Sequence, residues 1–193
     1  TENLGKRNTS VCKMAKAVGA EIFPVDIGVN TDRIFPGVIS RKVKKGTNDF
    51  LLKPAMSERE AMQAVRVGME LVKECKEAGY TLLGTGEMGI GNTTTSAAMA
   101  AALLSIPPEI VAGRGAGLSD EGLVRKRQVI SEALEKYQLR ETEPMRILCS
   151  VGGLDIAGLC GVFLGGAKYH MPIVADGVIS AVAALTAERL CPG

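Results

Sequence analysis

The sequence predicts an α/β fold: a doubly wound, Rossmann-like and mostly parallel sheet with helices on both faces. Short apolar runs alternate with glycine-rich turns and longer helical segments along the 193 residues, which is the pattern of consecutive βα units. Several of these runs are apolar on both faces, as strands covered by helices on either side must be. A chain of this length is expected to form a single α/β domain over residues 1–193.

Five apolar runs are predicted as the strands of this sheet. They are Glu21 to Gly28, Tyr80 to Gly84, Glu109 to Ala112, Met145 to Val151 and Met171 to Asp176.

The clearest helix is predicted from Ser57 to Ala78. Ser57 and Glu60 have the spacing of a capping box, and Gly79 supplies a stop. Apolar residues recur at three- and four-residue spacing on one face, at Met62, Val65, Met69 and Val72, as an amphipathic helix requires.

Four more helices are predicted, at about Asn92 to Ser105, Ser119 to Tyr137, Leu154 to Ala167 and Gly177 to Leu190. The pair Pro107 and Pro108 ends the first of them. Only the stretch from Thr31 to Pro54 does not fit the βα pattern, and it carries four basic residues within Arg41 to Lys45. This stretch is either a solvated connecting loop or an active-site lid or partner surface.

Composition argues against several classes of function. Lys and Arg number 23 against 21 Asp and Glu, giving a formal charge of +2, and aromatic residues make up 4% with no Trp. That is too little charge for a nucleic-acid surface and too few rings for base stacking. No apolar run approaches the roughly 18 residues of a membrane span, and the first residues are polar, unlike a signal peptide. We expect a cytoplasmic protein without nucleic-acid or membrane partners.

Cysteine and histidine usage argues against disulfide and metal chemistry. The five cysteines are scattered and never form C-x-x-C, so buried free thiols are expected at Cys12, Cys75, Cys149, Cys160 and Cys191. A single histidine, His170, argues against a multi-histidine metal site or a histidine-dependent triad. We expect His170 at a helix end or on the surface, and no metal.

Four turns follow the predicted strands after residue 80, where ligands bind in open parallel sheets. They read GTGEMGIGNTTT, AGRGAGLSDEG, VGGLD and ADGVIS, and each is glycine-rich or contains an acid. These turns are the candidate ligand site.

The first turn has the features of an anion site. Its glycines allow close backbone approach, and Asn92 with the following threonines opens a helix whose free N–H groups favour a phosphate. A tight turn followed by a capping Asn92 is the alternative. The segment from Gly84 to Gly89 also satisfies G-x-G-x-x-G, but Glu109 begins a predicted strand where a dinucleotide site needs an acid at a strand end. Glu87 would also oppose a pyrophosphate, so a dinucleotide fits poorly.

Three charged residues accompany these turns. Lys126 lies about two helical turns, roughly 10 Å, beyond the helix start near Ser119, within reach of a phosphate held by the loops. A surface lysine is the alternative. Glu87 and Asp176 would face one crevice, where a carboxylate accepts a proton, binds a ribose hydroxyl or stabilises positive charge at a sugar carbon. Asp176 could equally cap a helix.

At these residues the sequence resembles the nicotinate-nucleotide:dimethylbenzimidazole phosphoribosyltransferases, which make the lower-ligand nucleotide of cobalamin. The matching segments span essentially the whole chain: VDIGV (25–29), KKGTNDFLLKPAMSEREA (44–61), GEMGIGNTTTSAA (86–98), GRGAGLSDEGLVRK (113–126), VGGLDIAGLCG (151–161) and ADGVISAVAAL (175–185). Several long motifs in the right order are far more specific than one glycine-rich loop.

The resemblance implies a doubly wound homodimer that transfers ribosyl phosphate from nicotinate mononucleotide to a benzimidazole nitrogen. Inversion at the anomeric carbon is implied, with no metal or organic cofactor. Glu87 and Asp176 match acids of the family site in supporting catalytic roles, and Met88 would lie near the aromatic base. The remaining implied substrate-binding residues are Gly89, Ile90, Gly91, Asn92, Thr93, Gly115, Lys126, Gly153 and Gly177.

One departure from the family pattern carries an expectation about activity. The family's general base is a glutamate in a Ser/His-rich segment near the C-terminus, whereas this sequence reads Cys191, Pro192 and Gly193 before any such segment. The family's N-terminal portion is expected upstream of Thr1. We therefore expect the core of the large domain, weak or inactive alone. The alternatives are a non-catalytic module that binds a nucleotide phosphate and an NAD-binding oxidoreductase domain.

Overall fold

The structure is a computed structural model that describes all residues from 1 to 193, and the chain groups into two compact units. One unit comprises Thr1–Gly46 and the other Thr47–Gly193. The single-domain organisation expected from the chain length stays a prediction. No helix combines the length and the apolar character that crossing a membrane would need.

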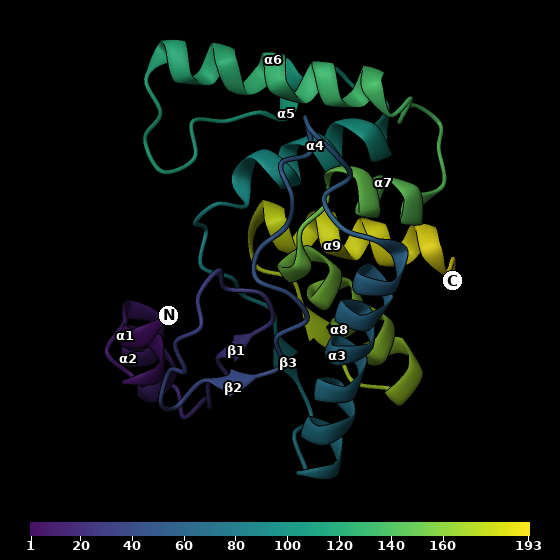
Figure 1. Cartoon of the computed structure of the whole chain (residues 1–193). Coiled ribbons are helices and arrows are strands. Elements are labelled where there is room, and N and C mark those ends of the chain that lie inside the picture. The colour runs from purple at the N-terminus through teal and green to yellow at the C-terminus, as the bar shows by residue number, and fades with distance from the viewer. The chain divides into compact units, whose positions relative to one another are not determined.

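The unit Thr1–Gly46 contains two short helices and one pair of strands (Figure 1). The helices are α1 (Glu2–Gly5) and α2 (Ser10–Ala17), and Thr9 caps α2 by accepting the N–H of Cys12. The strands β1 (Val25–Asp26) and β2 (Ile39–Ser40) are parallel, with Val25 opposite Ile39. β2 therefore lies within the stretch that the sequence left without secondary structure.

The unit Thr47–Gly193 is mainly helical, with one parallel pair of strands. Its helices are α3 (Glu58–Glu77), α4 (Thr93–Leu104), α5 (Pro108–Val111), α6 (Asp120–Lys136), α7 (Pro144–Val151), α8 (Leu154–Tyr169) and α9 (Gly177–Leu190). The strands β3 (Leu83–Gly84) and β4 (Ile173–Val174) pair in parallel, with Gly84 opposite Val174.

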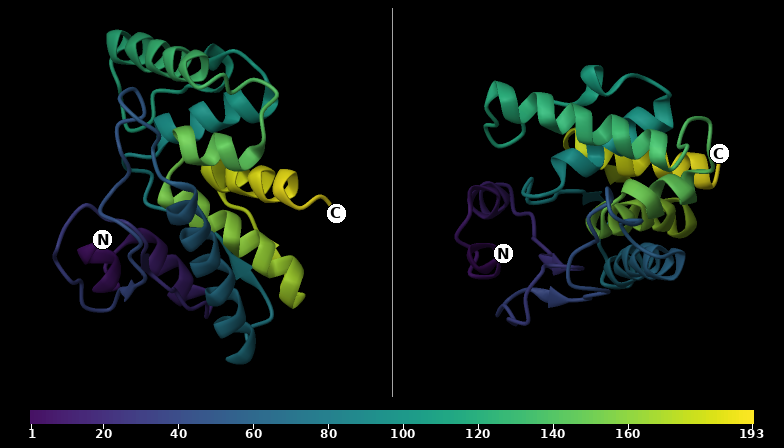
Figure 2. Two further views of the ribbon diagram at one scale, coloured as in Figure 1. Left: turned by 45° about the vertical axis from the view of Figure 1, so that its right-hand side comes forward. Right: turned by 45° about the horizontal axis from the view of Figure 1, so that its top comes forward.

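The helices of this unit stack in a consistent order. α4 contacts α6 on one side and α9 and α7 on the other, and α8 lies between α9 and α3, as Figure 2 shows from two directions. The core fills the space between them with small and aliphatic side chains such as Met99, Ile147, Leu148 and Ile156. The stack places the N-terminal ends of α4, α8 and α9 in the same unit as the β3–β4 pair.

The α3–α8 contact is the most extensive in the chain, and glycines make it close. A Cβ on Gly68 would overlap the carbonyl oxygen of Gly158, and one on Gly161 would overlap the carbonyl oxygen of Val65. The two helices therefore meet backbone to backbone, which only residues without a side chain allow.

The predicted helices are confirmed. α3 has Ser57 as its N-cap, and the capping box with Glu60 is formed in both directions. α4, α6 and α8 lie at or within two residues of their predicted limits, and α9 has the predicted limits. His170 ends α8 in the left-handed conformation and is exposed, as expected for a helix-end residue.

Two predicted strands are wrong. Glu109 to Ala112 lies mostly in α5, and Met145 to Val151 lies in α7. In both helices a proline occupies the first helical position, Pro108 or Pro144, where its fixed φ angle favours helix and its missing N–H costs nothing. In α7 the buried Ile147, Leu148 and Val151 also share one helical face.

The other three predicted strands are confirmed only as two-residue pairs. Glu21 to Gly28 contains β1, Tyr80 to Gly84 contains β3, and Met171 to Asp176 contains β4. The described fold is thus a helical protein with small parallel sheets rather than one continuous sheet. Of the cysteines, Cys12, Cys75 and Cys160 are buried as expected, whereas Cys149 is half-buried and Cys191 is exposed, and none is in a disulfide.

Candidate functional site

The loop between β3 and α4 folds around the carboxylate of Glu87. Its Oε2 accepts the backbone N–H of Gly89 and, at 2.7 Å, the side-chain amide of Asn92. Gly89 and Gly91 have φ angles of 70° and 81°, a conformation that favours glycine. The glycines of the first turn are thus required by the path of the chain, and Met88 and Ile90 lie exposed on the loop.

The N-terminal end of α4 has no side-chain cap. Asn92 occupies the N-cap position, but its side chain accepts none of the first N–H groups of the helix. Those groups lack intrahelical partners, and the helix dipole places partial positive charge at the same end. The alternative for Asn92, a side chain that caps the helix, is therefore not formed. Its side-chain amide donates to carboxylates instead.

Lys126 is buried beside this helix end. Its side chain leaves α6, and Nζ donates to Oγ1 of Thr93 and to the carbonyl oxygen of Gly113, both at 3.0 Å. The residue is 5% exposed, and burial lowers the pKa of Lys126. Both acceptors are neutral oxygens, so the buried ammonium has no carboxylate partner. The surface-lysine alternative is therefore wrong.

Gly115 fits closely against the same helix end. Its φ angle is 56°, and a Cβ there would lie 2.8 Å from Oγ1 of Thr93. The second turn and the start of α4 can approach this closely only because residue 115 has no side chain. The structure thus brings Thr93, Gly115 and Lys126 together, as the sequence predicts for an anion site. The turn follows the short helix α5, not a strand.

Asp176 follows β4 as Glu87 follows β3. The backbone N–H of Asp176 donates to Oγ1 of Thr85 at 3.3 Å, which ties the ends of the two paired strands together. Asp176 is the N-cap residue of α9, but its side chain makes no capping hydrogen bond, and it is exposed. Gly177 next to it has a φ angle of 76°. Both candidate acids therefore stand at the carboxyl ends of neighbouring strands, although the capping bond proposed for Asp176 is not formed.

Asp155 is a member of this cluster that the sequence reasoning missed. Its Oδ2 accepts the side-chain amide of Asn92 at 2.7 Å, across 63 positions in the sequence. The residue lies in the first turn of α8, and a Cβ on Gly153 would lie 2.5 Å from its Oδ1. The acid in the VGGLD turn was the available signal, but sequence spacing could not pair it with Asn92.

The other three glycine-rich or acidic turns thus each meet the β3–α4 segment, which is the first. The second reaches Thr93, the third reaches Asn92, and the fourth reaches Thr85. No group of three or more His, Cys, Asp or Glu side chains is arranged to hold a metal ion. The arrangement could bind an anion through Lys126 and the start of α4, with Glu87 on the loop before α4 and Asp176 after the paired strand β4.

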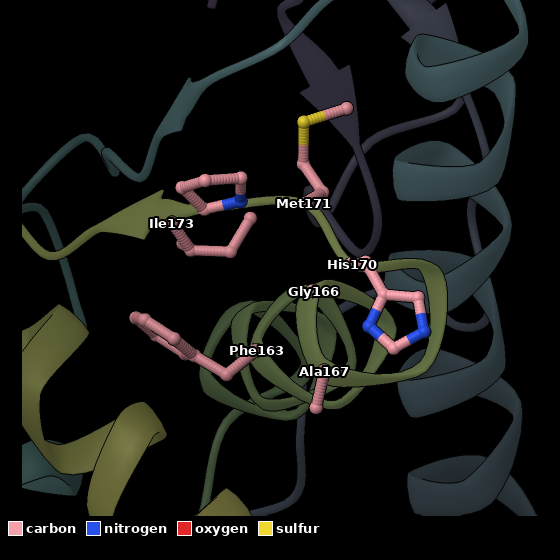
Figure 3. Close-up of a pocket in the computed structure, with 7 residues that line it drawn as sticks. Phe163, Gly166, Ala167, His170, Met171 and Ile173 are labelled. Carbon is pink, nitrogen blue, oxygen red and sulfur yellow. The ribbon is translucent and has the colours of Figure 1, made fainter.

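A separate hollow lies where α8 turns into β4. It is lined by Phe163, Gly166, Ala167, His170, Met171, Pro172 and Ile173 (Figure 3). The lining is mostly apolar and contains none of the predicted site residues.

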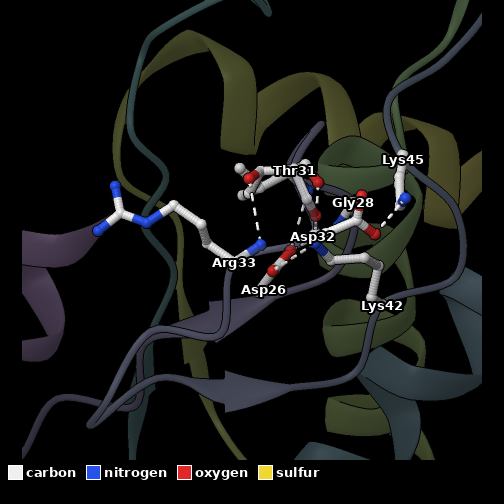
Figure 4. A network of polar contacts seen from close by, with 8 residues as sticks. Asp26, Gly28, Thr31, Asp32, Arg33, Lys42 and Lys45 are labelled. Carbon is white, nitrogen blue, oxygen red and sulfur yellow. Dashed lines mark hydrogen bonds and ion pairs between the residues drawn. The ribbon is translucent and has the colours of Figure 1, made fainter.

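The unit Thr1–Gly46 has its own polar network (Figure 4). Asp26 is almost fully buried, and its Oδ1 accepts the N–H groups of Gly28 and Val29. Lys42 pairs with Oδ2 of Asp26 at 3.1 Å and donates to the carbonyl oxygen of Thr31 at 2.6 Å. Part of the basic stretch is therefore held against β1 through Lys42, which argues against the solvated-loop alternative for that residue.

A family model described as phosphoribosyltransferase matches residues 1–193. The chain belongs to this phosphoribosyltransferase family. The family resemblance seen in the sequence is thereby confirmed.

Relatives within this family are similar to the chain over its whole length. The nicotinate-nucleotide–dimethylbenzimidazole phosphoribosyltransferase of Clostridium perfringens (strain ATCC 13124) is 44% identical over 192 residues, 100% of this chain and 53% of the relative. That of Alkaliphilus metalliredigens is 48% identical over 194 residues, 100% of this chain and 55% of the relative. The chain spans about half the length of these relatives.

A solved structure agrees with these relatives. The crystal structure of CobT from Thermus thermophilus is similar to this chain with a TM-score of 0.92 and 38% identity, covering 99% of this chain and 57% of that chain.

Proposed function

We propose that this chain carries the nucleotide-binding part of an enzyme that transfers the phosphoribosyl group of nicotinate mononucleotide to 5,6-dimethylbenzimidazole. The products are α-ribazole 5′-phosphate and nicotinate, in assembly of the cobalamin nucleotide loop. The names of the relatives support this choice of substrates. The observation that carries it is the buried ammonium of Lys126, which has no carboxylate partner.

The anion-binding argument rests on charge balance. An isolated charge is costly to bury, and proteins pair such charges or neutralise them. Lys126 has three N–H donors, of which two bond neutral oxygens. A phosphate at the uncapped start of α4 would accept the third N–H and the free backbone N–H groups together. A neutral ligand would not balance the buried charge of Lys126, so this arrangement favours an anion.

The carboxylates suit the sugar end of the substrate. As a benzimidazole nitrogen attacks the anomeric carbon and the bond to nicotinate breaks, positive charge develops at that carbon. Glu87 and Asp176 stand at the ends of paired strands in the same cluster, and a carboxylate near developing positive charge stabilises it. Met88 is half exposed on the loop and would contact an aromatic base.

The finer architectural features stay proposals. We propose that the β3–β4 pair belongs to a doubly wound parallel sheet, that the enzyme is a homodimer and that it acts in the cytoplasm. The parallel pairing of β3 with β4, with helices packed around it, supports the first of these. The family resemblance supports the other two.

Calorimetric titration with nicotinate mononucleotide tests the proposal, with free nicotinate and NAD as comparison ligands. Selective binding of the mononucleotide is expected, because only it combines a terminal phosphate with a single ribose. A folded chain that binds none of the three, or that prefers NAD, would contradict the proposal. The weak or absent turnover predicted from the sequence is tested separately by α-ribazole phosphate formation, and rapid formation by the purified chain would contradict that prediction.

A further inference from the structure

The side-chain amide of Asn92 joins two carboxylates from distant parts of the chain. Its Nδ2 donates to Oε2 of Glu87 and to Oδ2 of Asp155, each at 2.7 Å. An amide nitrogen has two hydrogens, so each carboxylate takes one of them. Asn92 is 6% exposed, which makes these two bonds its main polar contacts.

The other end of the amide shows what sets its orientation. Oδ1 of Asn92 is buried and has no hydrogen-bond partner. Rotating the amide by 180° would place that oxygen against both carboxylates and remove both charge-assisted bonds. The two carboxylates therefore fix the orientation of the amide, even though its oxygen is left without a donor.

Asp155 is the fixed member of this pair. It stands at the second position of α8, which packs backbone to backbone on α3. The absence of a side chain at Gly153 leaves the room that its carboxylate occupies. Glu87, in contrast, lies on the exposed loop and depends on its hydrogen bonds for its orientation.

The contacts of Glu87 leave one oxygen free. Oε2 accepts both the N–H of Gly89 and the amide of Asn92. Oε1 has no partner and is available to a ligand. The carboxylate is therefore anchored through one oxygen while the other stays available.

We propose that Asp155 is a positioning residue that orients the Glu87 carboxylate through the amide of Asn92. Asp155 contacts neither substrate nor reacting atoms in this arrangement; its role is to hold the amide that holds Glu87. The consequence for turnover rests on the proposed function, whereas the effect on the loop does not.

The test uses four single variants of the 193-residue chain and the double variant that combines Asp155→Ala with Asn92→Ser. Asp155→Ala removes the acceptor, Asp155→Asn keeps a neutral oxygen at the same place, and Asn92→Ser keeps an N-cap residue too short to reach both carboxylates. Glu121→Ala is the control, because Glu121 holds the same second position in α6 and is exposed.

Hydrogen exchange of the Gly89 N–H, measured by NMR without ligand, reports the Glu87 end of the chain of bonds. We expect about a 10-fold faster exchange in Asp155→Ala, as for loss of one charge-assisted hydrogen bond. Asp155→Asn should stay within about 3-fold of the parent, since a neutral acceptor restores most of the geometry. Glu121→Ala should have no effect, and Asp155→Ala should add nothing in the Asn92→Ser background.

Two results would overturn the proposal: parent-like exchange in Asp155→Ala, or additive effects of the Asp155 and Asn92 changes. If Asp155→Ala loses global stability in urea, the decision passes to Asn92→Ser, in which Gly89 exchange should also be about 10-fold faster; a parent-like rate there would overturn the proposal. If the parent turns over, kcat should fall about 10-fold in Asp155→Ala with KM for nicotinate mononucleotide unchanged. A parent that binds no nucleotide contradicts the proposed function, while the exchange data still decide the positioning role.

Discussion

Replacing Lys126 by methionine should separate phosphate binding from stability. Methionine retains most of the apolar stem of lysine but removes the ammonium, and with it the two hydrogen bonds to Thr93 and Gly113. Loss of those bonds is destabilising, whereas removing a buried charge without a carboxylate partner is stabilising. We expect these effects to offset each other, leaving the free energy of unfolding within about 1 kcal/mol of the parent value.

The effect on binding should be much larger. The third N–H of the Lys126 ammonium would make one charge-assisted hydrogen bond to the nucleotide phosphate, worth about 1.5–3 kcal/mol. Its loss should raise the dissociation constant for nicotinate mononucleotide about 10- to 150-fold. Calorimetry measures the binding and urea denaturation measures the stability of the same variant.

Lys136→Met is the matched control. Lys136 lies on the same helix α6, roughly 15 Å further along the axis, and also donates to two carbonyl oxygens, those of Leu51 and Leu52. It is exposed and distant from the start of α4, so its loss should leave nucleotide affinity unchanged. Parent-like affinity in Lys126→Met, or equal losses in the two variants, would refute the assignment of Lys126 to the phosphate.

Three further predictions use the same chain. Because burial lowers the pKa of Lys126, and a phosphate ester is dianionic above about pH 7, affinity for nicotinate mononucleotide should fall as pH rises from there through the lowered pKa. Calorimetry at several pH values checks this, and a flat profile would contradict it. Without ligand, the free energy of unfolding should rise with pH between the lowered and the ordinary pKa of Lys126, since the unfolded chain binds the proton more tightly in that interval. Gly68→Ala should destabilise the fold by about 3 kcal/mol in urea denaturation, since the added Cβ overlaps a carbonyl of α8. Gly84→Ala is the control and should be nearly neutral, because no atom lies within 4 Å of its added Cβ. Equal effects would argue against the close helix contact. Burial raises the pKa of Cys160 to about 12, so iodoacetamide at about pH 8 should label the exposed Cys191 and spare Cys160 until denaturant is added; mass spectrometry of the native protein locates the label, and early labelling of Cys160 would be inconsistent with its burial.

Helices with their own start and stop signals could be predicted from the sequence. Ser57 and Glu60 form the capping box that their spacing indicates. Of the apolar residues on the predicted face, Val65 and Val72 are buried, whereas Met69 is half-buried and Met62 is exposed. α9 begins and ends at the predicted residues. These elements are determined locally, so the local pattern was sufficient.

Short apolar runs after a proline could not be assigned from periodicity. Pro108 and Pro144 precede runs of four to seven residues, a length at which a buried strand and a buried helix look alike. The proline at the first helical position was the informative signal, and it favours the helices that form. With those two runs helical, the strands form two separate parallel pairs, β1 with β2 and β3 with β4.

The candidate site was predictable in its parts but not in its connections. The glycine-rich turns indicated an anion site, and Lys126 and Thr93 do lie together. The bond between Asn92 and Asp155 joins residues 63 positions apart, and no local pattern encodes such a pair. Only the packing of α8 against its neighbours reveals it.

The glycine contact between α3 and α8 has a consequence for where motion can occur. Helices that meet backbone to backbone interlock, so sliding or rotation of α8 would drive Gly161 into the main chain at Val65. The first turn of α8 is therefore a stationary reference point. We therefore expect adjustments around a ligand in the β3–α4 loop, where Met88 and Ile90 are exposed, rather than in α8.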